Sequence, residues 1–233
     1  MTIVDIFGYF APLDFAAVGF VLVSWLGMSW RIETSSFGRP SVTVLMVRYR
    51  REWMRQMVTR EPRIFDATIL SNLRQGTAFF ASGCMIALGG VLALLGNTES
   101  LNKVAVDLSV IEAPEYVWRI KLLLVALLLT HGFLKFVWSN RLFGYCAVLM
   151  GAVPNDLEHP QVYDRAAQAA EINIRAAWNF NRGLRAVYYS LGALAWLLGP
   201  LFLIASTVVV NVTIWNREFS SKPRDILEND AAP

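Results

Sequence analysis

The sequence has little charge and very few cysteine or histidine residues. Of 233 residues, 17% are charged and 55% are hydrophobic, whereas about 25% are charged in typical soluble domains. The two cysteines, Cys84 and Cys146, lie in apolar stretches and are too few for a disulfide scaffold or a thiolate metal site. One of the two histidines lies in a predicted turn, so the chain lacks the pair of histidines that would hold a b-type haem within the membrane. We therefore expect neither a cofactor nor a metal site.

The motifs of common enzyme classes are also missing. The sequence contains no Gly-rich phosphate-binding loop with its Lys, no dinucleotide fingerprint, no His-Glu-x-x-His and no nucleophile elbow. The net charge of +3 is not accompanied by a base-reading motif, so we expect no nucleic-acid partner. Because Met1–Phe10 contains no Lys or Arg, it lacks the basic start of a cleavable signal, and we expect the first apolar segment to be retained.

The apolar residues are concentrated in four blocks that are long enough to cross a membrane, because about 20 apolar helical residues span a hydrocarbon core of roughly 30 Å. The blocks are Ala11–Trp30, Ala78–Gly96, Val117–Trp138 and Val187–Asn211. Gly199-Pro200 marks a bend in the fourth block. The sequence predicts an all-α polytopic membrane protein with four transmembrane helices that extend into a cytoplasmic helical bundle. We expect one membrane domain over residues 1–219 and a disordered tail over residues 220–233.

Lysine and arginine are distributed unevenly among the connections. Arg31–Gln75 contains nine and Ser139–Ala186 contains five, whereas Asn97–Tyr116 contains one, Thr2–Pro12 none and the C-terminal tail three. The first and third connections of a four-span chain lie on the same side, and the positive-inside rule places them in the cytoplasm. We therefore expect a multi-pass protein of the bacterial inner membrane with both termini on the periplasmic side.

The two basic connections have helical patterns. In the first, apolar residues recur at helical spacing from Ser41 onward while arginines follow another face, until Glu61-Pro62 ends the helix. A further helix can then run into the second block, and the third block continues past Trp138 without a breaker. We predict cytoplasmic helical segments over residues 41–77 and 139–186.

His131 and Lys135 are candidates for chemistry inside the membrane. They lie four residues apart in the third block and share a helix face, and ionisable groups within a bilayer are costly. They could serve a proton step, an anion step or contact with a quinone headgroup. The alternative is that Lys135 extends to the headgroups while His131 hydrogen-bonds a neighbouring helix.

Arg48, Arg51 and Arg55 form a cationic face in the first connection. The simplest partner is anionic phospholipid headgroups, whose attraction is about 1 kcal/mol per basic residue near the surface. An acidic partner protein, or anions concentrated at a pore mouth, would use the same charges. We expect contact with lipid headgroups.

Five short motifs carry a resemblance to a known family. They are Tyr49-Arg50-Arg51-Glu52-Trp53-Met54, Phe79-Phe80-Ala81-Ser82, Arg141-Leu142-Phe143-Gly144-Tyr145, Gly151-Ala152-Val153-Pro154 and Phe180-Asn181-Arg182-Gly183-Leu184-Arg185-Ala186-Val187-Tyr188-Tyr189. Over most of Gly19–Glu218 the chain resembles the domain-of-unknown-function 599 family of bacterial and plant membrane proteins. The resemblance implies the membrane fold and no catalytic residue, because the family has no established activity.

The same motifs gather aromatic, amide and guanidinium side chains at predicted cytoplasmic helix ends. Such groups can converge between the helices of a bundle to form a ligand site. The candidate ligand-contact residues are Tyr49, Arg50, Trp53, Arg141, Tyr145, Asn181, Arg185 and Tyr188.

The sequence favours a non-enzymatic membrane subunit that is homo-oligomeric or belongs to a larger complex. It would act as a scaffold or as a channel-like assembly that handles anions. The alternative is a quinone- or proton-linked enzyme component that uses His131 and Lys135. An axial pore lined by basic groups would favour the channel.

Overall fold

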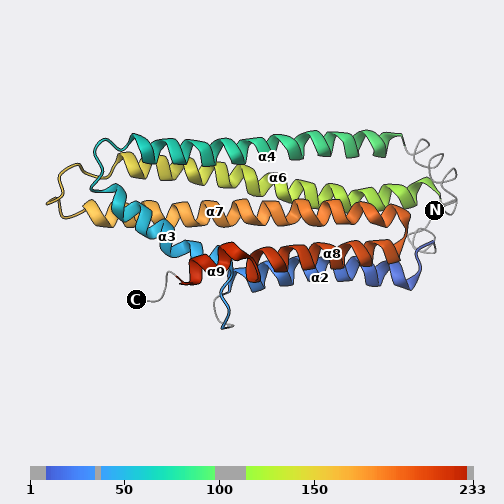
Figure 1. The fold of residues 1–233 in the computed structure, drawn as a ribbon. Helices are drawn as coiled ribbons and strands as arrows, with labels where there is room; N and C mark the ends of the chain where they lie inside the picture. Colours follow the sequence, from blue (N-terminus) through green and yellow to red (C-terminus); the bar gives the residue numbers. More distant parts are fainter. Residues whose placement is uncertain (1–8, 35–37, 98–113, 230–233) are drawn as a thin grey trace. The chain divides into compact units, whose positions relative to one another are not determined.

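The computed structural model describes residues 9–34, 38–97 and 114–229. Within these ranges the chain forms α-helices and one 3-10 helix, and no strand (Figure 1). The elements are α2 (Pro12–Glu33), α3 (Val42–Met57), α4 (Ile64–Gly96), α6 (Glu115–Gly151), α7 (Val162–Ala193), η1 (Leu194–Leu198), α8 (Pro200–Phe219) and α9 (Lys222–Asn229). The predicted all-α fold class is confirmed.

Four described segments are long and apolar enough to cross a membrane, which makes this a polytopic membrane protein. They are α2, α4, α6 and the segment Pro200–Asn229. The helices α4 and α6 contain 33 and 37 residues, or about 50 Å and 55 Å at 1.5 Å per residue. Because a bilayer core is only roughly 30 Å thick, part of each helix extends beyond it. This continuity of span and extramembrane helix follows the sequence prediction.

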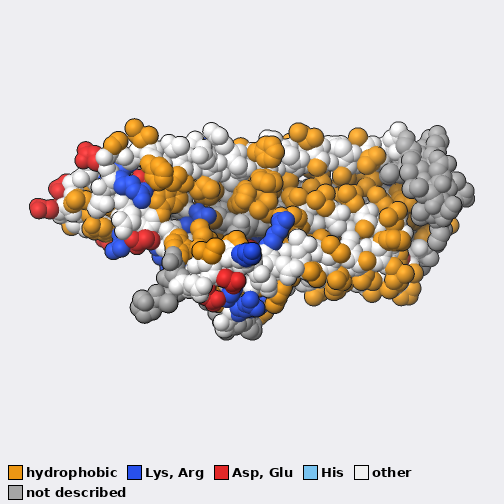
Figure 2. All heavy atoms as spheres, in the orientation of Figure 1, with side chains coloured by type: hydrophobic (Ala, Val, Ile, Leu, Met, Phe, Trp, Pro, Cys, Tyr) orange, Lys and Arg blue, Asp and Glu red, His pale blue; other side chains and the backbone are white. Residues whose placement is uncertain are grey.

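The chain divides into two compact units. Unit 1 comprises Met1–Arg31, Gly83–Gly132 and Leu184–Trp215, and unit 2 comprises Ile32–Ser82, Phe133–Gly183 and Asn216–Pro233. Large apolar side chains such as Val23, Ile86 and Leu201 are exposed on unit 1, as lipid contact requires. On the face shown in Figure 2, the acidic and basic side chains gather over elements of unit 2.

The chain breaks within the predicted fourth span. The helix α7 ends at Ala193, and η1 follows it. Gly199 then adopts a φ of +130°, a conformation that strains any residue with a Cβ. Pro200 starts α8, where its missing N–H costs nothing. The chain thus breaks at Gly199-Pro200, where the sequence predicts a bend, and the fourth candidate span begins at Pro200 and not at Val187.

Polar contacts in unit 1 show that α8 returns alongside α7. The Ser206 hydroxyl donates to the Gly192 carbonyl at 2.8 Å, and the Tyr189 hydroxyl donates to the side-chain oxygen of Asn211. The Asn211 amide in turn donates to Ser24 of α2 at 3.1 Å. Side-chain hydrogen bonds of this kind hold helices together where surrounding lipid provides no hydrophobic drive.

Two further contacts give the direction of α7 relative to α2. The Arg185 guanidinium donates from Nε to the Ser29 hydroxyl at 3.1 Å, near the end of α2. The Trp196 indole of η1 donates to the buried Asp14 carboxylate at 2.7 Å, in the first turn of α2. The segment from Arg185 to Trp196 thus runs the length of α2 in the opposite direction. Unit 1 contains an additional helical pass that the hydropathy pattern merged with α8.

The C-terminal segment is ordered as far as it is described. The predicted disorder over residues 220–233 is wrong for Lys222–Asn229, which forms α9, and residues 230–233 lie outside the described residues. Arg224 is buried and donates to the Pro40 carbonyl at 3.1 Å, while the Leu227 carbonyl accepts from Arg48 of α3. Because α9 contacts α3, the prediction that the C-terminus lies across the membrane from the first connection is also wrong.

In unit 2, α4, α6 and α7 approach closely at an aromatic cluster. Phe136 is fully buried and its ring centroid lies 5.4 Å from those of Phe80 and Phe180. Gly183 of α7 faces this ring, and a Cβ at that position would lie 2.8 Å from Phe136. The absence of a side chain at Gly183 therefore lets α7 pack against Phe136. The helix α7 continues through Gly183.

Candidate functional site

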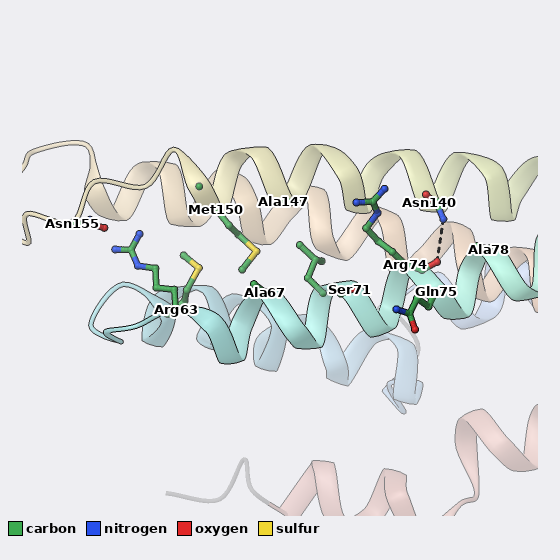
Figure 3. A pocket seen from close by; sticks show the side chains of 13 residues that line it. Arg63, Ala67, Ser71, Arg74, Gln75, Ala78, Asn140, Ala147, Met150 and Asn155 are labelled. Atoms are coloured by element: carbon green, nitrogen blue, oxygen red, sulfur yellow. Dashed lines mark hydrogen bonds between the residues drawn. The ribbon is translucent and has the colours of Figure 1, made fainter.

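A cavity of about 590 Å³ lies in unit 2 between α4 and the end of α6 (Figure 3). This volume falls within the range of about 300–1,000 Å³ that is usual for small-molecule sites. We call this cavity the upper hollow. It is lined by Met57, Arg63, Ala67, Leu70, Ser71, Arg74, Gln75, Ala78, Asn140, Ala147, Met150, Gly151 and Asn155.

Arg63 and Arg74 are the two charged residues that line the upper hollow. The Arg63 guanidinium donates to the carbonyls of Val153 and Pro154 at 2.8 and 3.0 Å, so it closes one end of the hollow. The Arg74 side chain reaches from α4 toward α6 (Figure 3). Within the described ranges its guanidinium has no hydrogen bond or ion pair. Arg74 is therefore available to a ligand, whereas Arg63 serves the fold.

Asn140 of α6 fixes the backbone of α4 beside Arg74. Its side-chain amide donates to the Arg74 carbonyl at 3.1 Å and to the Thr77 hydroxyl at 3.2 Å. The Thr77 hydroxyl itself donates to the Arg74 carbonyl at 2.7 Å. These bonds position the Arg74 backbone while its guanidinium lines the upper hollow.

A second hollow continues the groove along the same two helices. We call it the lower hollow, and it is lined by Ala78, Ala81, Ser82, Val137, Asn140 and Arg141. It shares Ala78 and Asn140 with the upper hollow, so the two are adjacent. We call both together the α4–α6 groove.

The lining of the α4–α6 groove contains three arginines and neither Asp nor Glu. Arg141 donates from Nε to the Tyr145 hydroxyl at 2.6 Å, and its two terminal nitrogens have no hydrogen bond among the described residues. Because no acid neutralises these cations from within the lining, the groove attracts anions. Guanidinium groups bind carboxylate and phosphate through paired hydrogen bonds.

The predicted ligand-contact residues do not form one site. Arg141 lines the groove and Tyr145 supports it, whereas Arg50 lies in the interior of unit 2. Arg50 donates to Asn173, whose amide contacts the Cys146 sulfur at 3.7 Å. Burial lowers the pKa of Arg50, while the nearby Cys146 raises it by a smaller amount. Arg50 ties α3 to α7.

Trp53 and Asn181 also join helices within unit 2. The Trp53 indole donates to the Asp66 carboxylate at 2.7 Å, and Arg60 pairs with the same oxygen of this fully buried acid. Asn181 of α7 donates to the Thr43 hydroxyl in the first turn of α3 at 3.1 Å. Both contacts lie among residues outside the groove lining.

The other predicted contact residues lie elsewhere. Arg185 and Tyr188 belong to unit 1, where Arg185 is buried against Ser29. Tyr49 accepts a hydrogen bond from Arg48 at 2.8 Å, and the Arg48 guanidinium also lies over its ring. A functional role for these residues stays a prediction.

The three arginines predicted to meet lipid headgroups have partners within the chain. Arg48 donates to the Leu227 carbonyl, and Arg51 pairs with Glu171 at 2.7 Å. Arg55 pairs with Glu52 at 2.9 Å, and these hydrogen bonds raise the pKa of Arg55 and, with that from Gln56, lower the pKa of Glu52. Contact of the three with lipid stays a prediction.

His131 and Lys135 belong to different units. In unit 1 the His131 ring meets Trp25 edge to face, with centroids 4.8 Å apart. No three His, Cys, Asp or Glu side chains of the described ranges are grouped to hold a metal ion. The proposed quinone or proton chemistry of His131 and Lys135 stays a prediction.

The sequence contains one signal for the groove, which is a set of lining residues at helical spacing in α4. Ser71, Arg74, Gln75 and Ala78 follow the spacing i, i+3, i+4 and i+7, so they share one face of α4. By charge alone, Arg74 indicates only the topology of the first connection. The facing Asn140 comes from α6, and its proximity depends on helix packing that a single sequence does not contain.

Comparison with known proteins gives one family and no characterised relative. The family model described as "Protein of unknown function, DUF599" matches residues 16–223. This range includes every residue that lines the α4–α6 groove. No curated protein and no solved structure matches the chain.

Proposed function

We propose, for a chain that belongs to the DUF599 family of proteins of unknown function, a role as a non-enzymatic membrane subunit that binds an anionic amphiphile in the α4–α6 groove. The observation that carries the proposal is the Arg74 guanidinium, which has no hydrogen bond or ion pair among the described residues and lies in a largely apolar hollow without acids. An amphiphile satisfies both properties of this lining, because its anion meets the guanidinium and its hydrocarbon meets the apolar wall.

The two kinds of contact contribute differently. Burying hydrocarbon stabilises a complex by about 0.8 kcal/mol per methylene, so a chain of several carbons provides most of the affinity. A single arginine near a membrane surface adds about 1 kcal/mol. We therefore expect the apolar wall, which includes Ala67, Leu70 and Met150, to set the strength of binding and Arg74 to select the anion.

We place the protein in the bacterial inner membrane with the start of α2 on the periplasmic side and the C-terminus in the cytoplasm. Eighteen Lys and Arg residues lie outside the four apolar blocks, and seventeen of them follow the first, third or fourth block. The exception, Lys103, lies outside the described residues. Because α9 contacts α3, the three basic residues after the fourth block share a side with the first connection. An orientation with this side in the cytoplasm agrees better with the positive-inside rule than one with both termini outside. The groove would then open toward the cytoplasmic leaflet.

We also propose that the protein works within a homo-oligomer or a larger membrane complex. Ile64, Phe65 and Val148 lie on the unit 2 portions of α4 and α6, and each is more than 60% exposed. Exposed apolar side chains on helix portions that extend beyond a bilayer core mark surfaces that a partner covers. This supports the assembly role without identifying the partner.

Titration of purified protein in amphipol tests the binding proposal. Dodecyl phosphate and neutral dodecylglycerol would be compared by calorimetry for the wild type and Arg74→Gln. We expect the variant to bind dodecyl phosphate about fivefold more weakly and dodecylglycerol equally well. Arg175→Gln is the control, because Arg175 is an exposed unit 2 arginine outside the groove lining. If Arg74→Gln bound dodecyl phosphate as strongly as Arg175→Gln does, the proposal would be contradicted.

A further inference from the structure

We infer that the ligand is an anionic diacyl phospholipid of the surrounding bilayer, with its phosphate between Arg74 and Arg141 and one acyl chain in each hollow of the groove. This inference rests on the proposed function and adds the source, the number of chains and the orientation of the ligand. It assigns lipid binding to residues other than Arg48, Arg51 and Arg55.

The lower hollow is built from membrane-spanning sequence. Ala78, Ala81 and Ser82 belong to the apolar block that starts at Ala78, and Val137 belongs to the block that ends at Trp138. Small side chains on α4 create this hollow beside the hydrocarbon of the bilayer. An acyl chain can therefore enter it sideways from the membrane, whereas a soluble molecule would first have to cross the headgroups.

Arg74 lines the upper hollow, Arg141 lines the lower hollow, and the two hollows meet at Ala78 and Asn140. Arg74 precedes the apolar block of α4 by four residues, and Arg141 follows that of α6 by three. Trp138 is partly exposed at the end of the latter block, as is usual for tryptophan at the membrane interface. Asn140 lines both hollows, so Arg74 and Arg141 border adjacent stretches of the groove. This is the depth at which a phospholipid carries its phosphate.

The available nitrogens suit a phosphate. The Tyr145 hydroxyl occupies Nε of Arg141, which leaves the planar pair of terminal nitrogens for a ligand. The Arg74 guanidinium adds a second set of donors with no described partner. Two guanidinium groups can bind different oxygens of one phosphate through charge-assisted hydrogen bonds, and no acid in the lining competes for them.

The upper hollow requires a second chain. It meets the lower hollow at Ala78 and Asn140, and apolar side chains including Met57, Ala67, Leu70 and Met150 contribute most of its wall. A single-chain amphiphile would leave one of the two hollows empty. A diacyl lipid with separated chains fills both and keeps its phosphate at the arginines.

Native mass spectrometry of protein reconstituted in lipid nanodiscs tests this inference. Retention of phosphatidylglycerol, its single-chain lyso form and phosphatidylcholine would be compared for four α4 and α6 variants. Ala67→Phe fills the upper hollow, Ser82→Phe fills the lower hollow, and Arg141→Gln removes a phosphate contact. Ala87→Phe is the matched control, because Ala87 is equally exposed on α4 but outside the groove lining.

We expect the wild type to retain phosphatidylglycerol at least fivefold more than phosphatidylcholine, and Arg141→Gln to lose this preference. Each hollow-filling variant should retain about tenfold less phosphatidylglycerol, because the phenyl ring occupies the space of an acyl chain, whereas Ala87→Phe should match the wild type. Retention of the lyso form as strongly as the diacyl lipid would overturn the inference. If dodecyl phosphate binds but phosphatidylglycerol does not, the inference fails while the proposed function stands; failure of both ligands rejects both.

Discussion

At the scale of single residues, the arginines of unit 2 differ in what holds them. Arg60 pairs with buried Asp66, Arg63 donates to backbone carbonyls, and Arg50 bonds to Asn173. The guanidinium of Arg74 has no such contact among the described residues. Composition and spacing reveal that these residues are cationic, but the partners of Arg50 and Arg63 come from distant parts of the chain. This is why a motif indicates Arg141, whereas Arg74 is interpreted from the sequence only as one of the arginines that determine topology.

Asp66 should stabilise the corner between α3 and α4. It is 0% exposed and its Oδ1 accepts from both Trp53 and Arg60. Asp66→Asn removes the charge opposite Arg60, and we expect a loss of about 1–3 kcal/mol, compared with about 1 kcal/mol for Trp53→Phe. Thermal unfolding followed by tryptophan fluorescence would rank them. A smaller shift in Tm for Asp66→Asn than for Trp53→Phe would contradict this assignment.

The pair between Arg182 and Glu33 should be insensitive to alkaline pH. Nε of Arg182 donates to Glu33 at 2.9 Å, and hydrogen bonding by Glu33 raises the pKa of Arg182 against a smaller lowering by burial. A raised arginine pKa means that the stabilisation is complete below the pKa of arginine in the unfolded chain and is lost only at pH values above it. Glu33→Gln should therefore lower Tm by the same amount at pH 7 and pH 10. A difference that disappears by pH 10 would show that another group controls the pair.

At the scale of elements, the sequence predicted the long helices well and the chain reversal poorly. Periodicity and breakers gave α3, and unbroken apolar runs gave α4 and α6. In Val187–Asn211, the end of α7 and the start of α8 are both apolar, so hydropathy alone joins them into one span. Gly199-Pro200 allows the chain to reverse, and contacts such as that of Ser206 with Gly192 hold α8 beside α7. The polar segment Lys222–Asn229 resembled a disordered tail because its helix depends on burial of Arg224 against α3 and its preceding loop.

The packing of α7 against α6 should depend on Gly183. A methyl group there would lie 2.8 Å from the buried Phe136 ring, so Gly183→Ala should destabilise the protein by about 1–3 kcal/mol. Replacing the ring by the smaller side chain in Phe136→Leu should make the alanine tolerable. Gly76→Ala is the control, since a Cβ there meets nothing within 4 Å. A Gly183→Ala protein as stable as Gly76→Ala would show that the helices are not in close contact.

At the scale of the whole molecule, the reversal at Gly199 allows the segment at the end of α8 to contact α3. Glu218 at the end of α8 accepts hydrogen bonds from both the backbone N–H and the hydroxyl of Thr43, each at 3.1 Å. The end of α8 is thus attached to the first turn of α3, where a carboxylate also complements the helix dipole. In the proposed orientation, the helical segment from Arg185 to Trp196 is one further membrane pass, and the distribution of Lys and Arg along the sequence agrees with it.

Cysteine labelling of membrane vesicles checks this arrangement. Thr59→Cys, just after α3, and Ser221→Cys, just before α9, should react with a membrane-impermeant maleimide from the same side. Both should be labelled in inside-out vesicles and protected in intact cells. Labelling of the two positions from opposite sides would contradict the α7–α8 reversal.

The most direct measurement for the central claim is to map where an anionic amphiphile contacts the protein. Dodecyl phosphate carrying a photoreactive diazirine in its chain would be crosslinked to the protein, and the modified peptides would be identified by mass spectrometry. Binding in the α4–α6 groove predicts crosslinks within residues 67–82 and 137–151, with a marked decrease in Arg74→Gln. Crosslinks concentrated on α2 or α8, or unchanged in the variant, would contradict it.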